Sequence, residues 1–139
     1  MTIKFVDTYR NTCITELQTA VGASGRLHIY GGTQPPKGGT APTPLVSYTT
    51  GATLFSTILT GVGTVDIPSN AQAATSGGAG TVATWARLTT SGGAFVADMT
   101  VGGSSSFDLS LDNTSIVGPS NPPASTVTMT SMTITAMGA

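Results

Sequence analysis

A single histidine limits the acid–base chemistry that this chain can perform. His28 is the only histidine, and it lies in the run Leu27-His28-Ile29-Tyr30. Side chains alternate between the two faces of a strand, so His28 belongs on the face opposite Leu27 and Ile29. We expect it to face solvent or to be hydrogen bonded within the sheet. The G-x-S-x-G motif is absent, and no Ser-His-Asp arrangement can be placed around His28 from the sequence.

The carboxylates show no catalytic or metal-binding pattern either. A glycosidase needs two opposed carboxylates about 5–10 Å apart, and nothing in the sequence selects such a pair. Asp108, Ser110 and Asp112 resemble the start of a calcium loop, but Asn113 stands where the turn needs Gly and Pro119 where Glu is expected. One His and one Cys are too few for a zinc site. We therefore predict a protein that is not an enzyme, with no catalytic residues, no metal site and no cofactor.

The composition points to a surface that other proteins can cover. Charged residues make up 8 % of the chain, hydrophobic residues 39 %, and the net charge is −1. A surface of Thr, Ser, Gly and Ala loses little on being covered, because few ions must be desolvated. The five basic residues are dispersed, whereas nucleic acids and membranes require clusters of them. We expect protein partners, with no nucleic acid and no membrane; the alternative is a Thr-rich β domain without special surfaces.

Targeting signals are missing from the sequence. No stretch approaches the roughly 20 apolar residues of a membrane span. Asp7, Arg10 and Glu16 interrupt any signal-peptide core. Cys13 is the only cysteine, so no intrachain disulfide can form, and we expect it to be a small buried hydrophobic residue. These features predict synthesis in a cytoplasm without export by a signal peptide.

The elements that must position these residues begin with one helix in residues 1–22. Asp7 is the expected N-cap and Gly22 the expected end. Its threonines are poor helix formers, so the helix should depend on packing against its own sheet or a neighbouring subunit. A short strand at residues 2–6 is the alternative for the first residues. The predicted apolar stripe, spaced by three and four, is Val6, Tyr9, Cys13, Leu17, Ala20 and Val21.

Residues 23–139 alternate with period two and predict about eight short strands. Residues 81–90 and 94–101 form a hairpin around residues 91–93. Residues 53–60 carry apolar groups on both faces and predict a central strand. Residues 126–136 change phase near Thr130 and Ser131, which predicts a β-bulge. Without βαβ alternation, the pattern predicts a single, mainly β domain of jelly-roll or β-sandwich type with one N-terminal α-helix.

Candidate contact residues come from the helix and from the loop at residues 31–44, which holds four prolines and four glycines. Long ordered loops often carry function. Trp85 is expected to anchor the core, and the alternative is an interface or sugar-stacking platform that also uses Tyr30 and Tyr48. The proposed partner interface consists of Tyr9, Tyr30, Gln34, Pro35, Pro36 and Lys37.

Three runs in order, residues 25–36 (GRLHIYGGTQPP), 81–102 (beginning TVATWARL) and 109–116 (LSLDNTSI), resemble segments of small structural proteins of tailed bacteriophages. The chain is similar to the family of head decoration, or cement, proteins. That resemblance implies a jelly roll on the outside of the capsid, made in the host bacterial cytoplasm, bound to the major capsid protein and often a homodimer. The alternatives are a receptor- or carbohydrate-binding module of a phage fibre and a neck or tail completion protein.

Overall fold

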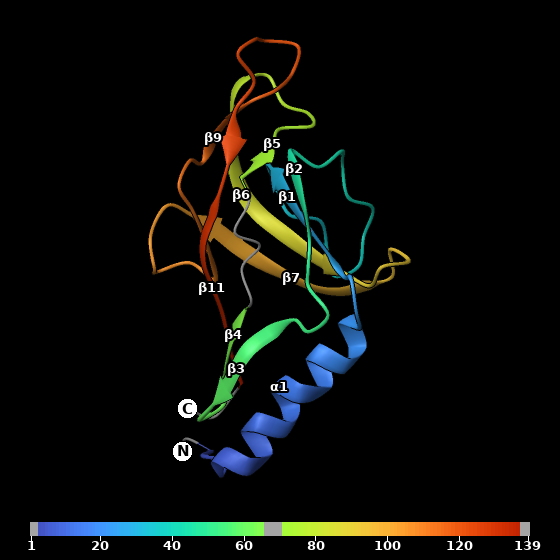
Figure 1. The fold of residues 1–139 in the computed structure, drawn as a ribbon, viewed down its shortest axis with the longest axis vertical. Helices are drawn as coiled ribbons and strands as arrows, with labels where there is room; N and C mark the ends of the chain where they lie inside the picture. Colours follow the sequence, from blue (N-terminus) through green and yellow to red (C-terminus); the bar gives the residue numbers. More distant parts are fainter. Residues whose placement is uncertain (1–2, 66–70, 137–139) are drawn as a thin grey trace.

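The computed structural model describes residues 3–65 and 71–136, so Asp66 lies outside the described residues. Within them the protein is mainly β with one helix, as the sequence predicts (Figure 1). The described residues form eleven strands rather than about eight, because several are only two or three residues long. The elements are α1 (Asp7–Val21), β1 (Arg26–Gly31), β2 (Val46–Thr49), β3 (Phe55–Leu59), β4 (Val62–Val65), β5 (Gln72–Ala73), β6 (Ala79–Thr89), β7 (Phe95–Gly102), β8 (Leu109–Leu111), β9 (Ser115–Val117), β10 (Thr126–Val127) and β11 (Met129–Thr135).

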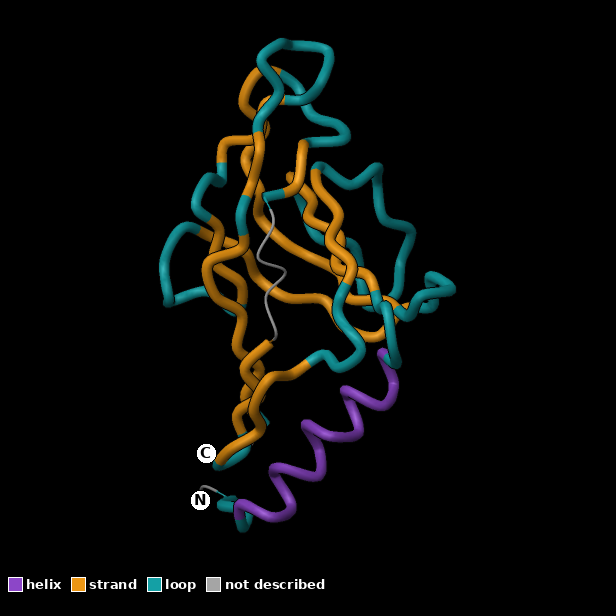
Figure 2. Tube along the Cα trace, viewed as in Figure 1, coloured by secondary structure: helices purple, strands orange, loops and turns teal. Residues whose placement is uncertain are grey.

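Nine of the strands form one large curled sheet (Figure 2). Its order is β2-β1-β6-β7-β8-β11-β4-β3, with β9 added beside β6, while β5 and β10 pair separately. All pairings are antiparallel except that of β7 with β8. Curling brings the apolar faces of distant strands together, and this architecture is consistent with the predicted β-sandwich or jelly roll.

The core lies on one face of the β1–β6–β7 region. Leu27 and Ile29 of β1 and Ala86 and Leu88 of β6 are buried there. Their neighbours along each strand point to the other face, because side chains alternate. Met132 of β11 joins the same cluster from a distant part of the sequence. Burial of this kind contributes about 1.5–3 kcal/mol for each large apolar side chain.

The predicted hairpin and the predicted bulge are both confirmed. In the turn between β6 and β7, the Thr90 amide donates to the Ala94 carbonyl and the Gly93 amide to the Thr90 carbonyl. Gly93 has φ 86°, a conformation that favours glycine. The register of β11 against β8 shifts between Met129 and Ser131, which is where the change of apolar phase predicts it.

The prediction of a central strand at residues 53–60 is wrong. β3 pairs only with β4 and forms one end of the sheet. Leu54 and Phe55 at its start are buried, but Leu59 at its end is exposed. Only Phe55 of the strand itself is buried, so the apolar residues on both faces reflect an edge strand whose start enters the core; α1 lies beside this strand (Figure 1).

The helix has the predicted extent but faces a different way. It ends at Gly22, whose amide donates to the Gln18 carbonyl, as expected. The N-cap is Val6 rather than Asp7, and no side chain caps the helix; residues 3–6 form no strand. The side chains of Asn11 and Gln18 accept hydrogen bonds from the amides of Gly61 and Phe55, at 2.7 and 3.0 Å.

These two bonds fix the rotation of α1 about its axis, so that Arg10, Ile14 and Val21 turn inward. Tyr9 and Cys13, which the sequence predicts on the buried stripe, are exposed instead. The expectation that Cys13 is a buried hydrophobic residue is therefore wrong. The apolar residues of α1 do not set its rotation by themselves, since Ile14 and Val21 face inward whereas Tyr9 and Cys13 do not; polar contacts with β3 and its turn decide it.

Candidate binding surfaces

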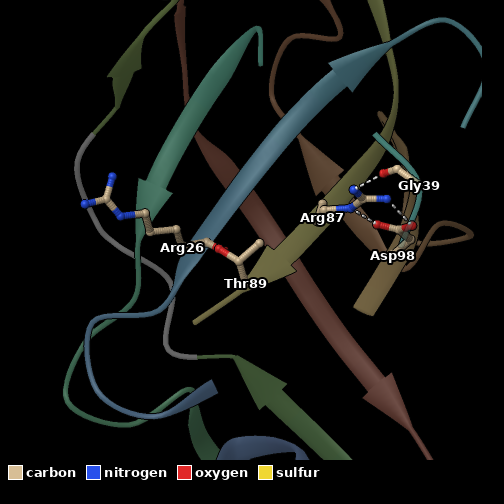
Figure 3. Close-up of polar contacts among 5 residues, drawn as sticks. All are labelled: Arg26, Gly39, Arg87, Thr89 and Asp98. Carbon is tan, nitrogen blue, oxygen red and sulfur yellow. Dashed lines mark hydrogen bonds and ion pairs between the residues drawn. The ribbon is translucent and has the colours of Figure 1, made fainter. Parts of the chain in front are cut away.

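The loop between β1 and β2, residues 32–45, is fastened to the outer face of the sheet by Arg87 of β6. We call it the Pro-rich loop. Arg87 Nη1 donates to the Gly39 carbonyl at 2.7 Å. Its Nε and Nη2 atoms donate to the two carboxylate oxygens of Asp98 in β7, at 2.7 and 2.9 Å (Figure 3). Thr84 adds a hydrogen bond to the Gly32 carbonyl at 2.6 Å. Strand β6 thus holds the loop at its first residue and near its middle.

Aromatic rings surround this guanidinium. Tyr30 stacks on Trp85 with ring centroids 4.2 Å apart. The Arg87 guanidinium carbon lies 5.4 Å from the Trp85 ring centroid and 5.0 Å from that of Phe95. The bond to Asp98 raises the pKa of Arg87, and burial raises the pKa of the Tyr30 phenol. Two positions further along β6, Thr89 donates to the Arg26 carbonyl at 3.4 Å (Figure 3). The charge at the centre of this face is therefore permanent and fully paired.

The outer side of the Pro-rich loop forms a shallow depression with β7. Gln34 and Lys37 line it together with Phe95, Val96 and Asp98, and its volume is about 340 Å³. Gln34, Pro36 and Lys37 are exposed and Pro35 is half-buried. Because Arg87 holds the backbone behind them, these side chains are presented in a preorganised arrangement. We call this the loop surface.

The structure does not gather all six predicted contact residues. Gln34, Pro35, Pro36 and Lys37 lie on the Pro-rich loop, whereas Tyr9 lies in the first turn of α1, whose N-terminal end is at the bottom of Figure 1, away from that loop. Tyr30 is buried under the loop, so its prediction as an accessible contact residue is wrong. Its side chain is on the outer face of β1, but the loop that follows in the sequence folds back and covers it.

The three aromatic residues proposed for sugar stacking, Tyr30, Tyr48 and Trp85, are buried. Trp85 is only 2 % exposed, as expected of a buried anchor, but it packs on the outer face of the sheet against Tyr30 rather than in the main core. Tyr48 is buried on the opposite face, where its hydroxyl donates to the Val127 carbonyl at 2.8 Å. Burial raises the pKa of the Tyr48 phenol. All three aromatic residues proposed for stacking are thus covered by protein.

His28 and the two carboxylates that flank β8 have structural partners. His28 Nδ1 lies 2.7 Å from Ser47 Oγ, which confirms that this histidine is satisfied within the sheet. Burial, helped by the charge of Arg26, lowers the pKa of His28. Asp108 accepts from the amide and hydroxyl of Thr100, and Asp112 from the Thr128 amide. In residues 3–65 and 71–136, no three His, Cys, Asp or Glu side chains come close enough to hold a metal ion.

A second surface lies where α1 begins. Ile3, Phe5, Val6 and Tyr9 are all exposed there, and we call them the apolar patch. They adjoin a groove of about 310 Å³ between α1 and the end of β11, lined among others by Leu17, Ile134 and Ala136. Sequence reasoning identified Tyr9 but missed Phe5 and the β11 residues. Nothing in the sequence signals that the end of β11 lies next to the helix.

No helix in the described residues is long and apolar enough to cross a membrane.

Comparison with known proteins finds no matching family model, no similar curated protein and no similar solved structure.

Proposed function

We propose that this chain is a structural virion protein that binds the outside of a phage capsid and links neighbouring subunits of the major capsid protein. The observation that supports this most directly is the presence of two exposed surfaces in different parts of the molecule. The loop surface presents Gln34 and Lys37, and the apolar patch presents Phe5 and Tyr9. A subunit with two separate contact surfaces can hold two neighbours at once.

The mechanism is stabilisation by linkage. A protein that binds only the assembled shell shifts the equilibrium towards that shell by mass action. Two contacts on one rigid subunit add avidity, so neither needs to be strong alone. The Arg87 bonds to Gly39 and Asp98 order the loop before binding, which reduces the conformational entropy lost when a partner covers it.

Low charge supports the same role. Arg87 and Asp98, which lie behind the loop surface, neutralise each other. Lys37 is then the one charged side chain of the Pro-rich loop. Burying such a surface therefore requires few ions to lose their hydration.

A homodimer, which the resemblance implies, would double the number of contacts. Analytical ultracentrifugation of the purified chain tests for it.

The test uses purified shells of the phage that encodes the chain. Lys37→Glu reverses the charge of the loop surface, and Tyr9→Ser removes an aromatic ring from the apolar patch. Neither side chain is buried, so both variants should fold. We expect each to weaken binding in a co-sedimentation assay. Val82→Ser, at an exposed position of β6 away from both surfaces, is the matched control and should bind as wild type.

Copy number separates this proposal from its nearest alternative. A cement protein is present in hundreds of copies per virion, whereas a neck or tail completion protein is present in a few. Quantitative mass spectrometry of purified particles, referred to the major capsid protein, measures this ratio. A few copies per particle would overturn the cement proposal in favour of the completion protein, and no binding of wild type to shells would also overturn the cement proposal.

A further inference from the structure

The groove between α1 and the end of β11 contains an unusual polar group. Most of its lining is apolar, from Phe5, Tyr9, Leu17, Ile134 and Ala136. Arg10 also lines it, although only 10 % of the Arg10 side chain is exposed. A charged side chain that is nine-tenths buried in an apolar wall is costly unless its donors are paired.

Arg10 is only partly paired. Its Nη1 atom donates to Asp7 Oδ1 at 3.1 Å. Its buried Nε atom has no acceptor among the described residues. The guanidinium lies against the backbone of Gly61, where a Cβ would come within 2.7 Å of both Cζ and Nε. The side chain thus packs against Gly61 and keeps a donor that the described part of the chain leaves unsatisfied.

The other buried arginine shows what such a donor can hold. Arg87 uses its Nε and Nη2 atoms together to bind both oxygens of Asp98. The corresponding edge of Arg10 makes no hydrogen bond within residues 3–65 and 71–136. Carboxylates match this edge in geometry and charge, and such bidentate pairs are among the strongest hydrogen bonds in proteins.

We propose that this groove binds an extended segment of a partner protein, with an apolar side chain between α1 and β11 and a carboxylate on the Nε–Nη2 edge of Arg10. This inference deepens the proposed function, because it gives the chemistry of the partner segment that the apolar patch contacts. The Nε atom of Arg10 is covered in the free protein. The Arg10 side chain must therefore rotate for a carboxylate to reach Nε, and rotamer changes of this kind are common at interfaces.

Volume and charge favour a peptide carboxylate over other ligands. At about 310 Å³, the groove is at the lower end of small-molecule sites, which is room for one or two side chains rather than a long acyl chain. Asp7 already neutralises part of the Arg10 charge, so a singly charged carboxylate fits better than a doubly charged phosphate. The exposed patch residues Ile3 and Val6 extend the apolar surface beyond the groove, as an extended segment requires.

The experiment titrates the full ¹⁵N-labelled chain with two capped pentapeptides, acetyl-Gly-Leu-Asp-Leu-Gly-amide and the same peptide with Asn in place of Asp. We expect saturable NMR shifts at the Arg10 Nε–H signal and at groove amides with the Asp peptide. The Asn peptide should bind about tenfold more weakly, because it lacks the hydrogen bonds to a charged acceptor. Equal affinity for the two peptides, or no saturable shift at millimolar concentration, would overturn the inference.

Variants locate the binding. Arg10→Lys keeps the charge but removes the paired donors, and should abolish the preference for Asp over Asn. Tyr9→Ser should weaken both peptides several-fold, whereas Val82→Ser should leave both affinities unchanged. If Arg10→Lys does not fold, the two peptides on the wild-type chain still decide the question. Peptide binding without shell binding would overturn the proposed function alone, and shell binding without peptide binding would overturn this inference alone.

Discussion

Replacing Asp98 by Asn removes the negative partner of a guanidinium that has almost no contact with solvent. The side chains of Arg87 and Asp98 are 8 % and 5 % exposed, and their closest N–O distance is 2.7 Å. Asn can still accept one hydrogen bond, but it carries no charge. The Gly39 carbonyl remains as the other acceptor of Arg87. The Arg87 charge therefore stays buried and loses its counter-ion.

The expected loss of unfolding free energy is about 3 kcal/mol. Removing one partner of a buried ion pair costs about 3–5 kcal/mol, and the hydrogen bond that Asn retains places this variant at the lower end. Single domains have a total stability of about 5–15 kcal/mol, so the effect is a large fraction of it. Asp7→Asn is the control, because Asp7 is 59 % exposed in its pair with Arg10, so water already screens much of that attraction and the loss should be clearly smaller than for Asp98→Asn.

Urea unfolding followed by tryptophan fluorescence measures both variants, since Trp85 is the only tryptophan and lies against Arg87. The double variant Arg87→Met with Asp98→Leu removes both charges. It should cost clearly less than the sum of Arg87→Met and Asp98→Leu measured singly, because neither charge is then left unpaired. The reasoning would be refuted if Asp98→Asn cost less than about 1 kcal/mol, or if the two single losses simply added.

Three further predictions follow from packing, titration and exposure. Gly63→Ala should lose about 1–3 kcal/mol of stability, because the new Cβ would lie 2.6 Å from the Phe55 ring. Thermal unfolding measures this loss. The control is Gly92→Ala, which should be nearly neutral because its Cβ would meet nothing closer than 3.8 Å. The pKa of His28 is lowered in the folded state, so the unfolded chain binds more protons and the unfolding free energy should fall as the pH drops below about 6.5. His28→Asn should reduce the slope of unfolding free energy against pH, and an unchanged slope would contradict a lowered pKa of His28. The exposed Cys13 thiol should react with a chromogenic disulfide reagent in the native protein as fast as in urea; strong protection would contradict the position of α1.

Part of the loop attachment could have been predicted from the sequence. The Gly-Gly turn at residues 92–93 identifies the β6–β7 hairpin, and a tight turn there places Arg87 near Asp98 on the neighbouring strand. A cross-strand ion pair could therefore have been expected. The third bond, from Arg87 to the Gly39 carbonyl, could not, because a backbone carbonyl in a loop leaves no signal in the sequence.

The groove at α1 was beyond sequence reasoning for a different reason. Tyr9 and Cys13 are four residues apart, as are Arg10 and Ile14, so either pair could lie on the buried side of the helix. Hydrophobicity alone favours Tyr9 and Cys13, because Arg10 is charged. The helix rotates the other way because Asn11 and Gln18 bond to backbone amides around β3. A charged residue thereby turns inward and an aromatic residue turns outward.

By itself, the sequence determined the local features of this protein: one helix ending at Gly22, the hairpin at residues 81–101, the bulge in the last strand and a mainly β fold. Each of these depends on period, turn chemistry or composition over a few residues, which the chain carries locally. Only the tertiary structure decided that β3 is an edge strand, that Tyr30 is covered and that Arg10 lies in a groove with the end of β11. Those outcomes depend on which distant segments meet, and a segment's own residues do not encode the identity of its neighbours.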